Sequence, residues 1–244
     1  MPYQAFLFST INYNQGKVDK SLAYQLFGYE LDSKEPIDWP PETLAVYLAR
    51  ILNEKTPLEG KIKYRTADEL KAKKVFEDTG TSWRISTAAI VESILSLISK
   101  SPKDDRYIMN SRRHRYDENI VGRQALDSDN KFPLRAMYIN GNDRAIEETV
   151  CIAIDIMHDV FWSDSSKGGF LTKTLGVTCL FKFLKEVLLL HGVSKETLNV
   201  KFKDYLLKIR NEEDFTDETK FPASTKGLNA AFNLMMEHSG IIKK

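Results

Sequence analysis

The residues that follow the apolar run 4–11 have side chains that can hold a polar ligand. Asn12 and Gln15 carry amides that donate and accept hydrogen bonds, and Lys17 and Lys20 add two cations that can attract a phosphate. The amides lie between a predicted strand and a predicted helix start, which is where open α/β sheets usually bind ligands. The sequence therefore indicates a candidate phosphate or nucleic-acid site. The alternative is that these amides only satisfy the backbone of their own turn, as amides in most loops do.

Arginines are densest in the segment 106–123, which is the most cationic part of the chain. Its closely spaced basic residues are Arg112, Arg113, His114, Arg115 and Arg123. Because guanidinium groups bind phosphate oxygens with paired donors, Arg112, Arg113 and Arg115 are candidate contacts to nucleic acid. The simpler interpretation is a solvated loop that neighbouring carboxylates partly neutralise, which is the usual role of short charge runs.

Two predicted helix starts share a pattern of hydroxyl groups, a lysine and a glycine. Lys167 precedes the predicted helix 171–191, and Lys226 precedes the predicted helix 229–238. Backbone N–H groups at a helix start favour anions, so both lysines are candidate contacts to a phosphate or to the DNA backbone. Neither stretch is a nucleotide-binding P-loop, because the order is Lys-Gly and the earlier glycine of that motif is absent. Helix capping is the commoner role for such residues.

The sequence contains no arrangement that is typical of an enzyme. It has no Rossmann glycine fingerprint, no zinc-ligand spacing and no Cys-His or Ser-His pair with local support. Cys151 and Cys179 lie in apolar helical patterns and are expected to be reduced core residues. His158 shares a predicted helix with Asp155 and Asp159, but a metal site would want further ligands elsewhere, and a partly buried structural histidine is the preferred interpretation. We therefore predict no cofactor and no metal, and we assign no catalytic residue.

The composition is ordinary for a globular protein. Of 244 residues, 42% are hydrophobic and 28% are charged, and 35 Lys and Arg against 34 Asp and Glu leave a net charge of +1. Such a chain gains little from whole-molecule attraction to nucleic acid, so any DNA contact must come from a local patch. The first residues lack a signal-peptide pattern, and no apolar run is long enough to span a membrane. We expect a cytoplasmic protein with no membrane partner.

A mainly helical fold is needed to position these candidate residues. Apolar residues at helical spacing predict a first helix that Asp19 or Ser21 caps, with Val18, Leu22, Leu26 and Tyr29 on its buried face. Further helices are predicted at residues 42–53, 87–100, 143–162, 171–191, 195–209 and 229–238.

Strands are predicted only near the amino end, at residues 4–11 and 60–64. The predicted fold class is α/β and mainly helical, with a small N-terminal sheet remnant and a C-terminal multi-helix body. We expect two domains: residues 1–82, a strand–elbow–helix region that completes an α/β sheet, and residues 83–244, a helical domain.

The amino-terminal stretch also resembles a known family. The matching positions are Phe8, Ile11, Asn12, Gln15, Val18, Lys20, Ser21 and Leu22. In this order they resemble the middle of the DGQHR-motif proteins, the family that includes the DNA phosphorothioation regulator and relatives in bacterial defence clusters. The Asp-Gly-Gln-His-Arg signature itself is absent from this sequence. The resemblance implies the carboxyl-terminal portion of such a protein.

The resemblance implies a DNA-associated regulatory or defence role, in which the chain binds duplex DNA or a partner and does not catalyse a reaction. Two alternatives remain open. The chain is either a subunit or fragment of a nucleic-acid-processing enzyme whose catalytic part lies upstream, or a scaffold that binds another protein or forms a homo-oligomer.

Overall fold

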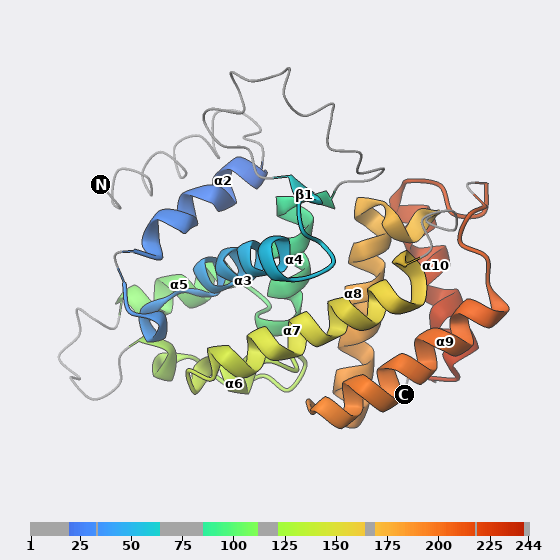
Figure 1. Ribbon diagram of the computed structural model, residues 1–244. Helices are drawn as coiled ribbons and strands as arrows, with labels where there is room; N and C mark the ends of the chain where they lie inside the picture. The colour runs from blue at the N-terminus through green and yellow to red at the C-terminus, as the bar shows by residue number, and fades with distance from the viewer. Residues whose placement is uncertain are drawn as a thin grey trace, which may run out of the picture.

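The computed structural model describes residues 20–32, 34–63, 85–111, 122–163, 169–217 and 219–241. Within these ranges the chain is mainly helical and contains a small two-stranded sheet (Figure 1). This confirms the predicted fold class, a mainly helical α/β protein. The predicted strand 4–11 lies outside the described residues.

The helices fall into two groups along the chain. The first group consists of α2 (Lys20–Phe27), α3 (Pro41–Lys55), α4 (Thr87–Ile98), α5 (Pro102–Ser111) and α6 (Arg135–Ile139). The second group consists of α7 (Asp143–Met157), α8 (Thr174–His191), α9 (Lys203–Glu212) and α10 (Thr225–Ser239).

Short helical turns connect or extend these helices. The 3-10 turns are η1 (Gly28–Glu30), η2 (Pro36–Asp38), η4 (Gly122–Ala125) and η7 (Phe170–Thr172). Two π-helical turns, η5 (His158–Trp162) and η8 (Thr197–Phe202), continue α7 and precede α9.

The sheet consists of β1 (Ile62–Lys63) and β2 (Ile85–Ser86), which pair in parallel. Ile62 lies opposite Ile85, and Lys63 lies opposite Ser86. Both isoleucines are buried, so the sheet closes one end of the helical core. The strand predicted at 60–64 is therefore present but shorter than expected.

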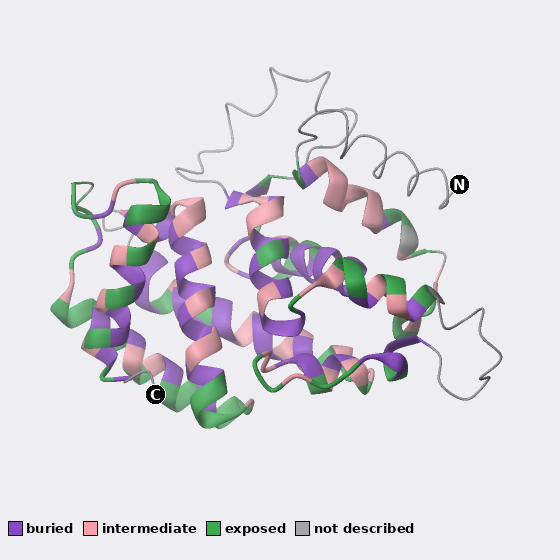
Figure 2. Cartoon of the chain, turned by 180° about the vertical axis from the view of Figure 1, so that it is seen from behind, coloured by how far each residue is buried: buried purple, intermediate pink, exposed green. Residues whose placement is uncertain are grey.

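Helices α4 and α8 pack against each other at the centre of the molecule. Helices α3 and α2 lie outside α4, α10 packs on the other side of α8, and α7 runs across the molecule toward α9 (Figure 1). Buried segments extend through both halves (Figure 2), and the buried apolar residues form one cluster from Trp39 to Ile241. The predicted domain boundary at residues 82 and 83 stays a prediction, although α3 from the first part packs directly on α4 from the second.

Local sequence signals explain most helix starts. Pro41 is the first residue of α3, where its fixed backbone angle suits the first turn. The Ser86 hydroxyl accepts a hydrogen bond from the Ala89 N–H and caps α4 as predicted. Ser224 caps α10 in the same way, so this helix begins at Thr225, before the predicted position.

Several details of the predicted helices are wrong. The side chain of Tyr29, which was expected to face inward, is 72% exposed. Leu190, which the apolar spacing of the predicted helix 171–191 places on its core face, is also exposed. Asp143, which the sequence offers as the cap of the helix 143–162, does not cap α7; its carboxylate binds Arg123 instead.

The guanidinium of Arg123 joins segments from distant parts of the chain. Arg123 is 1% exposed, and its Nε and Nη2 donate to the carbonyl oxygens of Trp39 (3.1 Å) and Pro36 (2.6 Å). Nη1 donates to the Tyr138 carbonyl oxygen (3.2 Å), and the Asp143 carboxylate accepts from both Nη1 and Nη2. The Tyr138 ring also lies 4.1 Å from the guanidinium carbon. We call this set of contacts the Arg123 cage.

Replacing Asp143 with Ala tests the Arg123 cage. The substitution leaves a buried guanidinium without its carboxylate, and we expect the free energy of unfolding to fall by about 3–5 kcal/mol. Urea denaturation of the two proteins measures this difference. The neighbouring Arg144→Ala is the matched control, because its side chain is 92% exposed and its removal should change stability by less than about 0.5 kcal/mol. Equal effects of the two substitutions would contradict a structural role for the cage.

Candidate functional site

The carboxyl ends of β1 and β2 and the amino ends of α2 and α4 meet in one place. Because the strands are parallel, Lys63 and Ser86 end them at the same edge of the sheet. Helix α4 begins directly after Ser86, and Lys20 begins α2 beside it. We call this place, formed by Lys20, Ser21, Lys63, Ser86 and Ala88, the strand–helix junction. It combines strand ends with helix amino termini, the arrangement that suits anion binding in α/β proteins.

Side-chain contacts hold α2 at the junction. The Ala88 N–H donates to the Ser21 hydroxyl oxygen at 3.3 Å, and the Thr87 hydroxyl donates to the Lys63 carbonyl oxygen. Lys20 Nζ lies 2.7 Å from Glu92 Oε1 on α4. Ser21, which the sequence offered as a cap for its own helix, therefore contributes to the amino terminus of α4 instead.

The junction combines exposed lysines with a nearby carboxylate. Lys20 is 69% exposed at its side chain and Lys63 is also exposed. Burial and the nearby Glu92 and Glu42 raise the pKa of the Tyr24 hydroxyl, so this side chain stays neutral under all ordinary conditions. Since Glu92 competes for Lys20, an incoming anion would have to replace that ion pair.

Only one of the four amino-terminal candidates lies among the described residues. Lys20 is at the junction, whereas Asn12, Gln15 and Lys17 lie outside the described residues. The end of the predicted strand 4–11 also lies outside the described residues, and the strand ends that lie beside Lys20 in the structure are those of β1 and β2.

The candidate arginines Arg112, Arg113 and Arg115 also lie outside the described residues, but the chain on both sides of them is described. On one side α5 is held by Asp105, which accepts hydrogen bonds from Arg135 Nη2 (2.9 Å) and the Ser99 hydroxyl (2.5 Å). Arg106 on the same helix pairs with Glu42 at 3.0 Å.

On the other side, the Arg123 cage holds the chain at Arg123. Gly122, directly before it, has a positive φ of 65° that L side chains rarely adopt. Buried ion pairs therefore lie on both sides of the arginine-rich connection. Arg123 itself is not available to bind phosphate, because it is buried and its N–H donors are used inside the protein.

The structure describes one of the two lysines at predicted helix starts. Lys167 lies outside the described residues. Lys226 is exposed in the first turn of α10, where Ser224 accepts a hydrogen bond from the Gly227 N–H at 3.4 Å. A Cβ on Gly227 would lie 2.0 Å from the Pro222 carbonyl oxygen, so the glycine serves close packing. Helices α10 and α2 lie on opposite sides of the molecule (Figure 1), so Lys226 and Lys20 do not form one patch.

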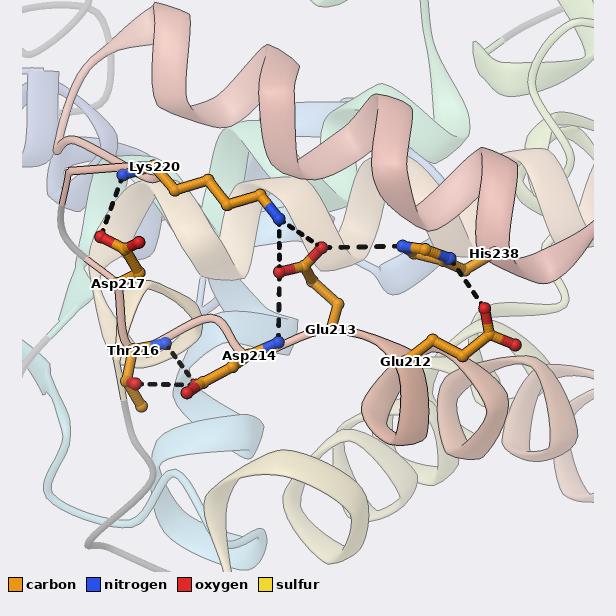
Figure 3. A network of polar contacts seen from close by, with 7 residues as sticks. All are labelled: Glu212, Glu213, Asp214, Thr216, Asp217, Lys220 and His238. Carbon is orange, nitrogen blue, oxygen red and sulfur yellow. Dashed lines mark hydrogen bonds and ion pairs between the residues drawn. The ribbon is translucent and has the colours of Figure 1, made fainter.

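A polar network that the sequence analysis did not identify joins α9 to α10 (Figure 3). Both carboxylate oxygens of Glu213 accept from Lys220 Nζ, at 2.8 and 2.7 Å. His238 lies between two carboxylates, with Nδ1 3.0 Å from Glu212 Oε2 and Nε2 3.6 Å from Glu213 Oε2. We call these four residues the α9–α10 clasp. Spacing gave no signal for it, because its residues belong to three separate segments.

The clasp closes a loop over an aromatic cluster. Phe215 and Phe221 are buried from this loop, with ring centroids 5.0 Å apart, and Phe215 also contacts Phe161 edge to face. The Phe170 N–H donates to the Phe215 carbonyl oxygen at 2.8 Å. Since every contact of the clasp fastens this loop, its chemistry is that of a structural ion-pair network.

The thiols and the imidazole considered in the sequence do not form a catalytic arrangement within the described ranges. Cys151 and Cys179 are both free thiols, and the second is fully buried. His158 contacts Asp159 at 3.6 Å on the same helical segment. Among the described residues no group of three His, Cys, Asp or Glu is placed to hold a metal ion.

The same part of the chain has no helix with the length and apolar character required to cross a membrane. In comparisons with protein-family models, with curated proteins and with solved structures, nothing matches the chain. The resemblance to the DGQHR-motif proteins therefore stays a prediction.

Replacing Glu213 with Gln tests the clasp. The carboxylate is 8% exposed while Lys220 is 46% exposed, so we expect a loss of about 1–2 kcal/mol, less than for a fully buried pair. Urea denaturation measures the loss. Glu237→Gln, an exposed change next to His238, is the control and should have almost no effect. A Glu213 variant as stable as this control would show that the clasp does not hold the loop.

The two cysteines should react slowly in the folded protein. Burial raises the pKa of Cys151 to about 11 and that of Cys179 to about 12, so little of either thiol is the reactive thiolate at neutral pH. We expect iodoacetamide to label neither quickly, and both to be labelled once urea unfolds the chain. Mass spectrometry of the intact protein counts the labels. Rapid labelling of the folded protein at Cys151 would reopen a nucleophilic role.

Proposed function

We propose that this chain is a cytoplasmic, DNA-associated regulatory or defence protein that acts by binding and not by catalysis. The observation that best supports the proposal is the strand–helix junction, where two strand ends and two helix amino termini meet beside the exposed lysines Lys20 and Lys63. The lysines are the groups that attract phosphate oxygens here, since the Ala88 and Ala89 N–H groups already donate to Ser21 and Ser86. The resemblance to DGQHR-motif proteins supports the choice of DNA as the source of these phosphates.

The arginine-rich connection supplies a second proposed contact. Arg112, Arg113 and Arg115 belong to a connection that has the Asp105–Arg135 pair on one side and the Arg123 cage on the other. Guanidinium groups bind phosphate oxygens with paired donors. Because the net charge is only +1, we expect moderate affinity that depends strongly on salt.

Anisotropy of a fluorescein-labelled DNA duplex, titrated over a salt series, tests the proposal. We expect the Arg112→Glu plus Arg113→Glu variant to weaken binding and to lower the slope of log K against log salt by about 0.9 for each phosphate that the variant no longer neutralises. Lys20→Gln plus Lys63→Gln should do the same at the junction, with a smaller effect because Glu92 already pairs with Lys20.

The control for the arginine variant reverses two lysines elsewhere. Lys201 and Lys208 are exposed on η8 and α9, across the molecule from α5 (Figure 1), and their change to Glu alters the net charge equally. We expect this variant to bind DNA nearly as well as the original chain. No binding by the original chain even at low salt would reject the proposal, and self-association in size-exclusion chromatography without DNA would favour the scaffold alternative.

A further inference from the structure

Helix α2 is held to the body in a different way from its neighbours. Ser21 is its one buried residue, whereas ten residues of α3 and eight of α4 are buried. The apolar side chains of Leu22, Leu26 and Phe27 all stay half-buried. Since buried apolar area is the main source of helix-packing stability, α2 gains much less from docking than α3 or α4 does.

Helix α2 docks through apolar and charged contacts together, since Tyr24 and Phe27 pack against the core while other contacts are charged. Lys20 pairs with Glu92 of α4, and the Arg106 guanidinium lies 4.9 Å from the Phe27 ring. The Arg50 guanidinium also lies against Gly28, because a Cβ there would be 2.0 Å from Arg50 Nη2. Such groups are hydrated well when exposed, so separating α2 from this surface costs less than separating two apolar faces.

One buried hydrogen-bond donor on α2 also weakens its docking. Gln25 Nε2 is shielded from water and has no hydrogen-bond partner among the described residues. A buried donor without a partner destabilises the docked arrangement by roughly 1–3 kcal/mol relative to an exposed one. Docking of α2 therefore depends on a few specific contacts.

The most specific of these contacts is the hydrogen bond from Ala88 N–H to the Ser21 hydroxyl oxygen, at 3.3 Å. The N–H groups in the first turn of a helix have no partner within that helix, so Ser21 supplies one from another element. Ser86 satisfies the next N–H, that of Ala89. Ser21 thus fastens α2 to α4 at the end where Lys20 joins the junction.

We propose that α2 opens from the helical body as a unit while α3 and α4 stay folded, and that the Ser21–Ala88 hydrogen bond is the latch. Opening removes Lys20 from the strand–helix junction and leaves the Ala88 N–H open to solvent. A regulatory effect on DNA binding rests on the proposed function, whereas the opening itself does not. The fold then contains a movable helix that sets whether the junction is complete.

Hydrogen exchange measured by mass spectrometry on the full chain without DNA tests the opening. We expect amides of α2 to exchange much faster than those of α3 and α4 under native conditions, because exchange reports the free energy of the local opening. Replacing Ser21 with Ala removes the acceptor and should speed exchange in α2 by about two- to five-fold. Ser21→Asp places a carboxylate at two helix amino termini and should slow it by a similar factor.

Asn199→Asp is the matched control, because it adds one negative charge on the exposed side of η8 and should leave exchange in α2 unchanged. Exchange of α2 at the rate of α3 in the original chain would overturn the proposal. So would an α2 rate that neither Ser21 variant changes; if Ser21→Asp does not fold, Ser21→Ala decides. Loss of DNA binding would reject the proposed function but not the opening, since no DNA is present in this experiment.

Discussion

The Arg123 cage is the interaction on which the first half of the structure depends. A guanidinium has five N–H donors in a fixed plane, and here they are used by carbonyl oxygens of Pro36, Trp39 and Tyr138 and by the Asp143 carboxylate. Through these contacts the proline-rich connector before α3 is fixed to α6 and α7. Burial also raises the pKa of the Tyr138 hydroxyl, which donates to the Trp39 carbonyl oxygen at 2.8 Å and stays neutral in this role. Loss of the charge would leave several carbonyl groups without donors at once.

The buried role of Arg123 could not be predicted from the sequence of the cationic segment. Arg123 follows the other arginines in sequence, and nothing in its spacing separates it from Arg112 or Arg115. Its role comes from Asp143 and from backbone carbonyls about 85 residues earlier, which local patterns cannot reveal. The helices themselves were predictable because apolar spacing and capping residues such as Ser86 act within a few positions. Asp143 shows the limit of that rule, since a residue suited to cap a helix was used for a distant ion pair.

Only part of the strand–helix junction was predictable from the sequence. Sequence patterns indicated a helix start near Lys20, but the strand end that they placed beside it belongs to residues 4–11, which lie outside the described residues. The strand ends in the structure belong to β1 and β2, which are two residues long and carry too little pattern to be paired from sequence. Their parallel pairing brings Lys63 and Ser86 together, although the two residues are far apart in sequence and no local pattern relates them. The α9–α10 clasp was missed for the same reason, since its contacts join residues up to 26 positions apart.

The contrast between α2 and the α9–α10 region follows from where apolar side chains are placed. The loop between α9 and α10 buries Phe215 and Phe221, so its ion pairs assist a contact that burial already favours. Helix α2 buries none of its leucines completely and contacts the core through the partly buried Tyr24 and Phe27, so its polar contacts carry a larger share of its docking. Each hydrogen bond or exposed ion pair contributes about 1 kcal/mol to stability, which is small compared with the contribution of a packed apolar core. An element held in this way can respond to a ligand that competes for Lys20, whereas the clasped loop cannot do so without exposing its phenylalanines.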